Sequence, residues 1–282
     1  MLHTHTRNTQ RQGGFTLVEL SLVLVIIGLI LGAVSIARDM QRNAEYVKIK
    51  QKFVDQWVSA YNNHYVRTGV VLGDSQIEPR FMVNGAKYAS ADSNVVSGRD
   101  MTNATLPLAI CEGAPDPLMV GLATPMGRNL TTDVSLHTEM ERHGITMPPG
   151  RAEGREDRYL YLDTNGNPQE LQICFQWNPP ETPSGSGNVM VITGLTPDLA
   201  RALDQMIDGQ ADAREGVFRQ AGVRDRDSAQ RTPQFEWSVN NMLAYEGNAD
   251  TIAATDRSRN NDGGRRNEDQ VITVIAHYKM NQ

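Results

Sequence analysis

An uninterrupted apolar run near the N-terminus constrains this chain more than any other feature. Residues 15–37, FTLVELSLVLVIIGLILGAVSIA, contain no proline and only one charged side chain, Glu19. As an α-helix this run would be about 34 Å long. That length is enough to cross the roughly 30 Å hydrocarbon core of a bilayer. The sequence therefore predicts a membrane-spanning helix over residues 15–37.

The residues before the run differ from those of an ordinary secretory signal. Such a signal has a shorter apolar core followed by a small-residue cleavage site, whereas here Gly13 and Gly14 precede the run. The stretch GGFTLVELSLVLVIIGLILGA resembles the class III signal of type IV pilins and type II secretion pseudopilins. The resemblance implies a leader, residues 1–14, that prepilin peptidase removes by cutting after Gly14, and a new, N-methylated terminus at Phe15. It also implies that Glu19 pairs with a neighbouring subunit's terminal amine during filament assembly.

Physical chemistry supports a role for Glu19 independently of the resemblance. A carboxylate inside the hydrocarbon costs roughly 2.5–3.5 kcal/mol on insertion scales, and it usually marks a functional site. Cleavage before Phe15 would create a cationic partner, either one turn away in the same helix or on an adjacent subunit of a staggered bundle. Pairing across subunits would also set their register. The alternative is an acid near the helix end whose carboxylate reaches the membrane surface.

The charges of the chain are unevenly distributed. Residues 38–67 contain six basic and three acidic side chains, and residues 68–282 contain 19 basic and 29 acidic ones. An acidic head argues against nucleic acid as a partner, because phosphate binding needs a basic face. The basic stretch after the apolar run could meet anionic lipid headgroups or acidic neighbours. The positive-inside rule alone would place this stretch in the cytoplasm, but the resemblance requires a cytoplasmic leader.

The remainder of the chain predicts one long helix followed by an α+β head. Apolar residues at helical spacing predict that the helix spans residues 15–67, with an amphipathic second half and an end at Gly69. Beyond it, residues 68–282 contain short apolar stretches separated by Gly, Pro, Asn and Asp. The sequence predicts an antiparallel sheet laid on the helix. The predicted helix stripe comprises Val47, Val54, Val58, Tyr61 and Tyr65. The predicted strands are 158–162, 171–177, 188–193 and 270–279.

Local signals add turns and one more helix to the head. The turn DTNGNP, residues 163–168, joins the first two predicted strands as a hairpin. Thr196 and Pro197 are typical of a helix start, and Gly209 of a helix end. The sequence also predicts flexible loops at residues 179–187 and 256–269.

Two cysteines, Cys111 and Cys174, lie in the predicted head. An even number of cysteines outside the cytoplasm favours a disulfide, which by closing a loop of this length could stabilise the head by roughly 4 kcal/mol. The alternative is two separate buried thiols. Their spacing matches no metal motif.

Candidate ligand residues for a metal are few. Asp204, Asp208 and Asp212 recur every four residues and could supply oxygens to calcium, but the run lacks the alternating ligands of a calcium loop, which favours a solvated acidic helix face. The histidines at 64, 137, 143 and 277 are scattered, and the sequence assembles neither a zinc site nor a catalytic triad from them. No phosphate-binding glycine loop is present. The sequence therefore predicts no enzyme and no cofactor beyond this calcium candidate.

These observations predict a pilin-like structural subunit. The resemblance implies an inner-membrane protein with a single span and a periplasmic head, whose partners are prepilin peptidase, an inner-membrane assembly platform, lipid and other pilin or pseudopilin subunits. After assembly, the head would be displayed on a pilus or a pseudopilus, outside the membrane or at the cell surface. Its large head favours a minor pilin or pseudopilin of a type IV pilus or type II secretion system. The alternative is a membrane-tethered periplasmic enzyme or binding domain that carries a prepilin-type signal.

Overall fold

The computed structural model describes two compact units of the chain. It describes residues 16–87, 107, 109–113, 135–180, 182, 184–221, 237, 243–246, 265–271 and 273–280, with the backbone alone at 35, 38, 243–246 and 265–271. One unit ends at Glu45, and the other begins at Tyr46. The second half of the predicted long helix therefore belongs to the head unit.

The described residues of the first unit are helical from Leu17 onward, and the same helix continues into the second unit. Helix α1, Leu17–Ile49, passes through Gly28 and Gly32 without interruption. A π-helical turn, Lys50–Val54, and helix α2, Asp55–Thr68, follow it directly. Among the described residues one helical stretch, Leu17–Thr68, is long and apolar enough to cross a membrane. Gly69 ends the stretch in a left-handed conformation with φ of +78°, which glycine adopts without steric cost.

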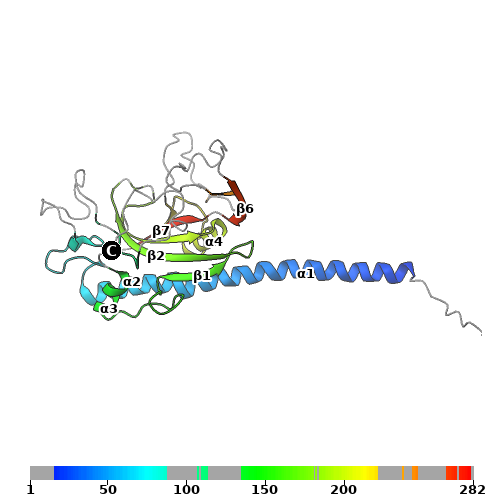
Figure 1. The fold of residues 1–282 in the computed structure, drawn as a ribbon, viewed down its shortest axis with the longest axis horizontal. Helices are drawn as coiled ribbons and strands as arrows, with labels where there is room; N and C mark the ends of the chain where they lie inside the picture. Colours follow the sequence, from blue (N-terminus) through cyan, green and yellow to red (C-terminus); the bar gives the residue numbers. More distant parts are fainter. Residues whose placement is uncertain are drawn as a thin grey trace, which may run out of the picture. The chain divides into compact units, whose positions relative to one another are not determined.

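The second unit is an α+β structure around a five-stranded antiparallel sheet, which confirms the predicted fold class. The strand order is β1-β2-β3-β7-β4. Figure 1 labels β1, β2 and β7 of this sheet. The bounds are β1 Arg158–Leu162, β2 Pro168–Asn178, β3 Gly187–Leu195, β4 Phe218–Gln220 and β7 Val274–Lys279. A separate two-stranded sheet comprises β5, Leu243–Glu246, and β6, Arg265–Val271. Helices α3, Leu136–Arg142, and α4, Pro197–Ile207, and a 3-10 turn at Gly85–Lys87 complete the described elements.

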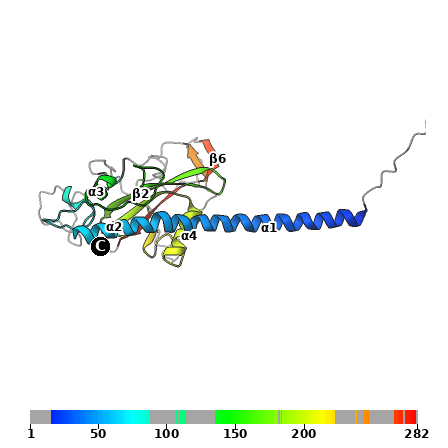
Figure 2. The same cartoon turned by 90° about the horizontal axis from the view of Figure 1, so that it is seen from below.

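The two faces of the sheet carry different clusters. Side chains of α2 and α4 share one apolar core with one face of the sheet, and Figure 2 shows both helices on the same side of β2. Alternate residues of each strand point to opposite faces. Thus Phe175 belongs to the core beneath the helices, whereas its neighbour Cys174 belongs to a smaller cluster on the other face.

The predicted helix stripe is partly wrong. Val54 and Tyr61 are buried, but Val47 is exposed. The buried face instead centres on Phe53 and Trp57, which lie against aromatic side chains of the sheet. The Phe53 and Tyr159 rings are 5.3 Å apart, and those of Trp57 and Phe175 6.3 Å. Bulky aromatic residues therefore define the seam between helix and sheet, and Tyr61 of the predicted stripe is one of them, since its ring stacks on that of Phe175 at 5.1 Å.

The strand predictions hold in the centre of the sheet and fail near its C-terminal end. The hairpin at residues 163–168 forms as predicted, because Asp163 Oδ1 accepts hydrogen bonds from the backbone N–H groups of Asn165 and Asn167, both at 2.8 Å. The single predicted strand 270–279 is instead divided between β6 and β7, which belong to different sheets. As a result, residues 265–269 are part of a strand and not of the predicted loop.

Candidate functional site

Thr16 and Glu19 together cap the N-terminal end of α1. The Glu19 carboxylate accepts hydrogen bonds from the Thr16 backbone N–H at 2.8 Å and from Thr16 Oγ1 at 3.0 Å. In return, the Glu19 backbone N–H donates to Thr16 Oγ1 at 3.3 Å. This reciprocal pattern is a capping box, which satisfies backbone donors that the helix itself leaves free.

The capping box fixes the Glu19 carboxylate beside the residue that follows the predicted new terminus. Gly14 and Phe15 themselves lie outside the described residues. A negative charge at the first turn also interacts favourably with the helix macrodipole. The carboxylate is thus held at the end of the helix, where an amine on residue 15 would be created by cleavage.

Apolar side chains cover the first half of α1 on all sides and are exposed. None of the most apolar 18-residue window of this helix is buried within the chain. An exposed apolar surface of this kind is stable only against lipid or against apolar surfaces of other molecules. The exposed large side chains between residues 17 and 36 are Leu17, Val18, Leu20, Leu22, Val23, Leu24, Val25, Ile26, Ile27, Leu29, Ile30, Leu31, Val34 and Ile36.

The two cysteines are joined in a disulfide, the pairing that their even number favoured. Cys111 and Cys174 have Cα atoms 4.5 Å apart and are separated by 63 residues in sequence. Both are buried on the face of the sheet opposite the helices. A backbone bridge between Ile110 and Phe175 adjoins them. The disulfide thus fastens the segment around residue 111 to the central strand β2.

The three candidate calcium ligands each accept hydrogen bonds from groups of the chain. Asp204 Oδ2 accepts from the indole N–H of Trp237 at 2.8 Å. Asp208 Oδ2 accepts from two backbone N–H groups, those of Val217 and Phe218, at 2.9 Å each. Asp212 Oδ1 accepts from the backbone N–H groups of residues 214 and 215. Asp208 and Asp212 therefore anchor the segment after α4, whereas Asp204 binds the side chain of Trp237, and calcium binding by the three stays a prediction.

Asp204 is the most perturbed of these carboxyl groups. Its side chain is buried, and burial together with the nearby charges of Asp208 and Asp212 raises its pKa to about 7, against an ordinary value of 3.8. The hydrogen bond from Trp237 acts in the opposite direction. Asp204 therefore changes its protonation state near neutral pH, where ordinary carboxyl groups are fully ionised.

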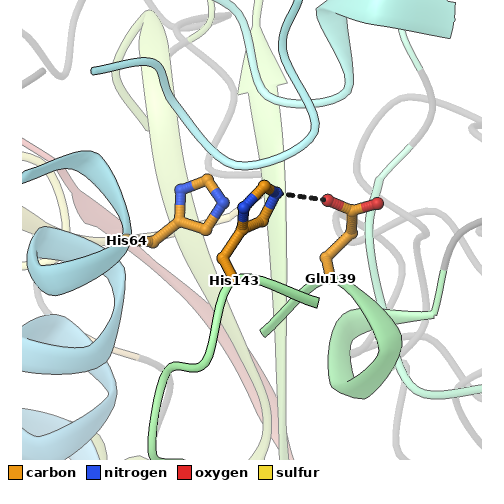
Figure 3. A group of neighbouring side chains, drawn as sticks. All are labelled: His64, Glu139 and His143. Atoms are coloured by element: carbon orange, nitrogen blue, oxygen red, sulfur yellow. Dashed lines mark ion pairs between the residues drawn. The ribbon is translucent and has the colours of Figure 1, made fainter. Parts of the chain in front are cut away.

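Two of the histidines that are scattered in the sequence come together in the head. His64 on α2 and His143 at the C-terminal end of α3 have ring centroids 4.9 Å apart in a T-shaped arrangement. Glu139 lies one turn before His143, and its Oε2 is 3.8 Å from His143 Nε2 (Figure 3). One potential ligand atom from each of the three side chains lies within 4.8 Å of the others.

His64 is buried, and its two ring nitrogens face different surroundings. Nδ1 lies 3.5 Å from Thr68 Oγ1, whereas Nε2 has no hydrogen-bond partner among the residues that the structure describes. Burial and the neighbouring His143 lower the pKa of His64 to about 4, although a hydrogen bond to the Val70 backbone opposes the shift. The ring is therefore neutral at neutral pH.

A third histidine positions the start of α3. His137 Nδ1 is 2.7 Å from a Glu112 oxygen, and His137 Nε2 is 2.7 Å from a Glu156 oxygen. Glu112 also accepts a hydrogen bond from Ser135, the N-cap residue of α3. These contacts tie α3 to the disulfide-linked segment and to the loop before β1.

Sequence reasoning missed these groupings for different reasons. The capping box has a sequence signal, T-x-x-E at Thr16 to Glu19, that could have been recognised. Glu139 and His143 are four residues apart, but α3 is too short to be predicted by apolar periodicity. The approach of His64 to His143 depends on the packing of two elements and has no local signal.

The comparison with known families identifies the N-terminal segment. A family model described as the prokaryotic N-terminal methylation motif matches residues 9–35. No curated protein and no solved structure matches the chain. The matched segment contains Gly14, Phe15 and Glu19, and it continues through most of the predicted membrane span.

Proposed function

We propose that this chain, which carries a prepilin-type N-terminal methylation motif and has a pilin-like α+β architecture, is a minor pilin or pseudopilin. The motif implies a prepilin that prepilin peptidase processes, and together with the apolar helix it suggests anchoring in the inner membrane. In this proposal the action of the chain is structural and involves no catalysis. Its N-terminal helix packs among those of other subunits, and its head is displayed outside the membrane.

A single observation supports the assembly role: the Glu19 carboxylate lies at the end of a helix whose apolar surface is not buried by any of the described residues. In the free subunit, Thr16 supplies its hydrogen bonds. In a filament, an ammonium group at the terminus of a neighbouring subunit would replace them by a charge-assisted pair, which is stronger than a neutral hydrogen bond. The pairing would also fix the stagger between adjacent helices.

The test is the incorporation of a Glu19→Ala variant into filaments. The proposal predicts that this variant reaches the membrane with its head exported but is lost from the filament fraction, because the register-setting pair is missing. Ser21→Ala is a matched control, since the Ser21 hydroxyl donates a hydrogen bond to the carbonyl of Val18 in the same helix.

Two results would count against the proposal. Normal incorporation of Glu19→Ala would contradict the role of Glu19. A wild-type chain that is absent from filaments of its own cells would favour a membrane-tethered enzyme or binding domain.

A further inference from the structure

We propose that His64, Glu139 and His143 bind one divalent transition-metal ion, with Zn²⁺ as the best match, and that this ion joins α2 to α3. The proposal does not depend on the proposed filament role. All three residues lie in the head unit, far along the chain from the methylation motif. The sequence predicted no zinc site, because the three ligands come from two elements, α2 and α3, that only the fold brings together.

The donor set is suited to a transition metal. Two imidazole nitrogens and one carboxylate oxygen are ligands that Zn²⁺ binds at about 2.0–2.2 Å. Neighbouring ligands of a tetrahedral ion with such bonds are roughly 3.4 Å apart. The distance from His143 Nε2 to Glu139 Oε2 is 3.8 Å, so side-chain shifts of a few tenths of an ångström would complete that pair. Calcium and magnesium prefer oxygen ligands and fit this set poorly.

The buried nitrogen of His64 is the observation that points to a ligand. His64 is 1% exposed, and within the described part of the chain its Nε2 has no hydrogen-bond partner. A buried polar atom without a partner is costly, and a bound ion would remove that cost. Figure 3 shows the His64 ring next to that of His143, with Glu139 on the far side of His143.

Neighbouring groups hold the three ligands in place. Thr68 lies at the other nitrogen of His64, which is how second-shell groups commonly orient a metal-binding imidazole. Arg67 donates hydrogen bonds to the carbonyl oxygens of His143 and Gly144 at 3.0 and 2.7 Å. These bonds fix the C-terminal end of α3 against α2. The ligand-bearing backbone is therefore positioned before any ion binds.

The site is also accessible from solvent. The His143 side chain is 26% exposed, whereas that of Glu139 is 10% exposed. Three protein ligands leave a fourth position, which water can fill from this side. Arg142 lies 3.4 Å from Glu139 Oε1, the oxygen that does not face His143, and its side chain is 69% exposed. Water therefore screens its charge from the site.

The test is a metal-binding measurement on the detergent-solubilised full chain. His3 and His5 are replaced by glutamine in every sample, so that leader histidines do not bind metal, and no polyhistidine tag is used. The protein is stripped with EDTA, loaded with Zn²⁺, dialysed and analysed by inductively coupled plasma mass spectrometry. The proposal predicts one Zn²⁺ per chain and a rise in the thermal midpoint when Zn²⁺ is added.

Variants assign the ion to this site. His143→Ala and Glu139→Gln should each lose the bound Zn²⁺ while circular dichroism shows an intact head. Glu141→Gln removes one exposed negative charge from the same helix and should keep the ion. Loading with Co²⁺ should give visible absorption typical of a tetrahedral site, and His143→Ala should abolish it. A wild-type chain that holds no Zn²⁺, or folded His143→Ala and Glu139→Gln variants that still hold it, would overturn the proposal.

Discussion

Similar apolar side chains are exposed in the first half of the long helix and buried in the second half. Leu24 in the first half is 61% exposed, whereas Phe53 in the second half is fully buried. Both belong to one helical stretch and are comparably apolar, so intrinsic helix preference does not distinguish them. The difference lies in the partner, since Phe53 contacts the sheet of its own chain, whereas no described residue buries Leu24. The first half is thus built for contacts outside the molecule and the second for contacts within it.

The largest predicted effect comes from truncating one apolar side chain in each half of the helix. Phe53→Ala should lower the free energy of unfolding of the head by about 3–5 kcal/mol, because it leaves a cavity in the core. Leu24→Ala should change the same quantity by less than about 0.5 kcal/mol, because Leu24 has no packing to lose. Urea unfolding in detergent, followed by the fluorescence of the buried tryptophans, measures both. Equal losses would show that the first half also packs on the head.

Removing the disulfide tests the stability of the head alone, because both of its cysteines lie in the head. Replacing Cys111 and Cys174 together by alanine should lower the free energy of unfolding by up to roughly 4 kcal/mol, since the unfolded chain regains the entropy of an open loop. Reduction of the wild-type protein by dithiothreitol should lower its urea midpoint, whereas reduction should leave the double variant unchanged. A wild-type midpoint that reduction does not move would mean that the bridge contributes nothing to the stability of the head.

The smallest predicted effect is a pH-dependent change in the stability of the head that comes from Asp204. Because its folded pKa is about 7 and its ordinary value 3.8, the folded head binds a proton between these values that the unfolded chain releases. The stability due to that proton is present at low pH and lost as pH rises through 7. Asp204→Asn mimics the protonated group, so its stability relative to wild type should increase by about 2 kcal/mol between pH 5 and pH 8.

Thermal unfolding of both proteins across this pH range checks the prediction. His64 titrates in both and cancels in the difference. Asp163→Asn is the control, since Asp163 lies in the hairpin turn. A wild-type to Asp204→Asn difference that does not vary with pH would contradict the prediction.

Local signals were enough to predict the central elements of the fold. The Asp163 turn and the Thr196-Pro197 helix start are determined by residues within a few positions, and both elements form where expected. Thr196, however, makes no side-chain capping bond. The division of residues 265–279 between two sheets could not be predicted, because alternation along a strand does not say which strands will pair with it.

Among the candidate sites, too, some features follow from local sequence and others only from the packing of distant elements. Glu19 could be singled out from the sequence because a lone acid in an apolar run is costly wherever the run inserts. The even number of cysteines favoured a disulfide but left two separate buried thiols as the alternative, which only the structure decides. The grouping of His64 with Glu139 and His143 needed the packing of α2 against α3, since the two histidines are far apart in the sequence.

The most direct test of the central account is the mass of the N-terminal peptide of the chain, isolated from the membrane and filament fractions of its own cells. The account predicts a peptide that starts at a methylated Phe15, with the 14-residue leader removed. Gly14→Val should abolish this processing, while Gly13→Ala should leave it in place. An exported, membrane-bound wild-type chain with an intact leader would contradict the account.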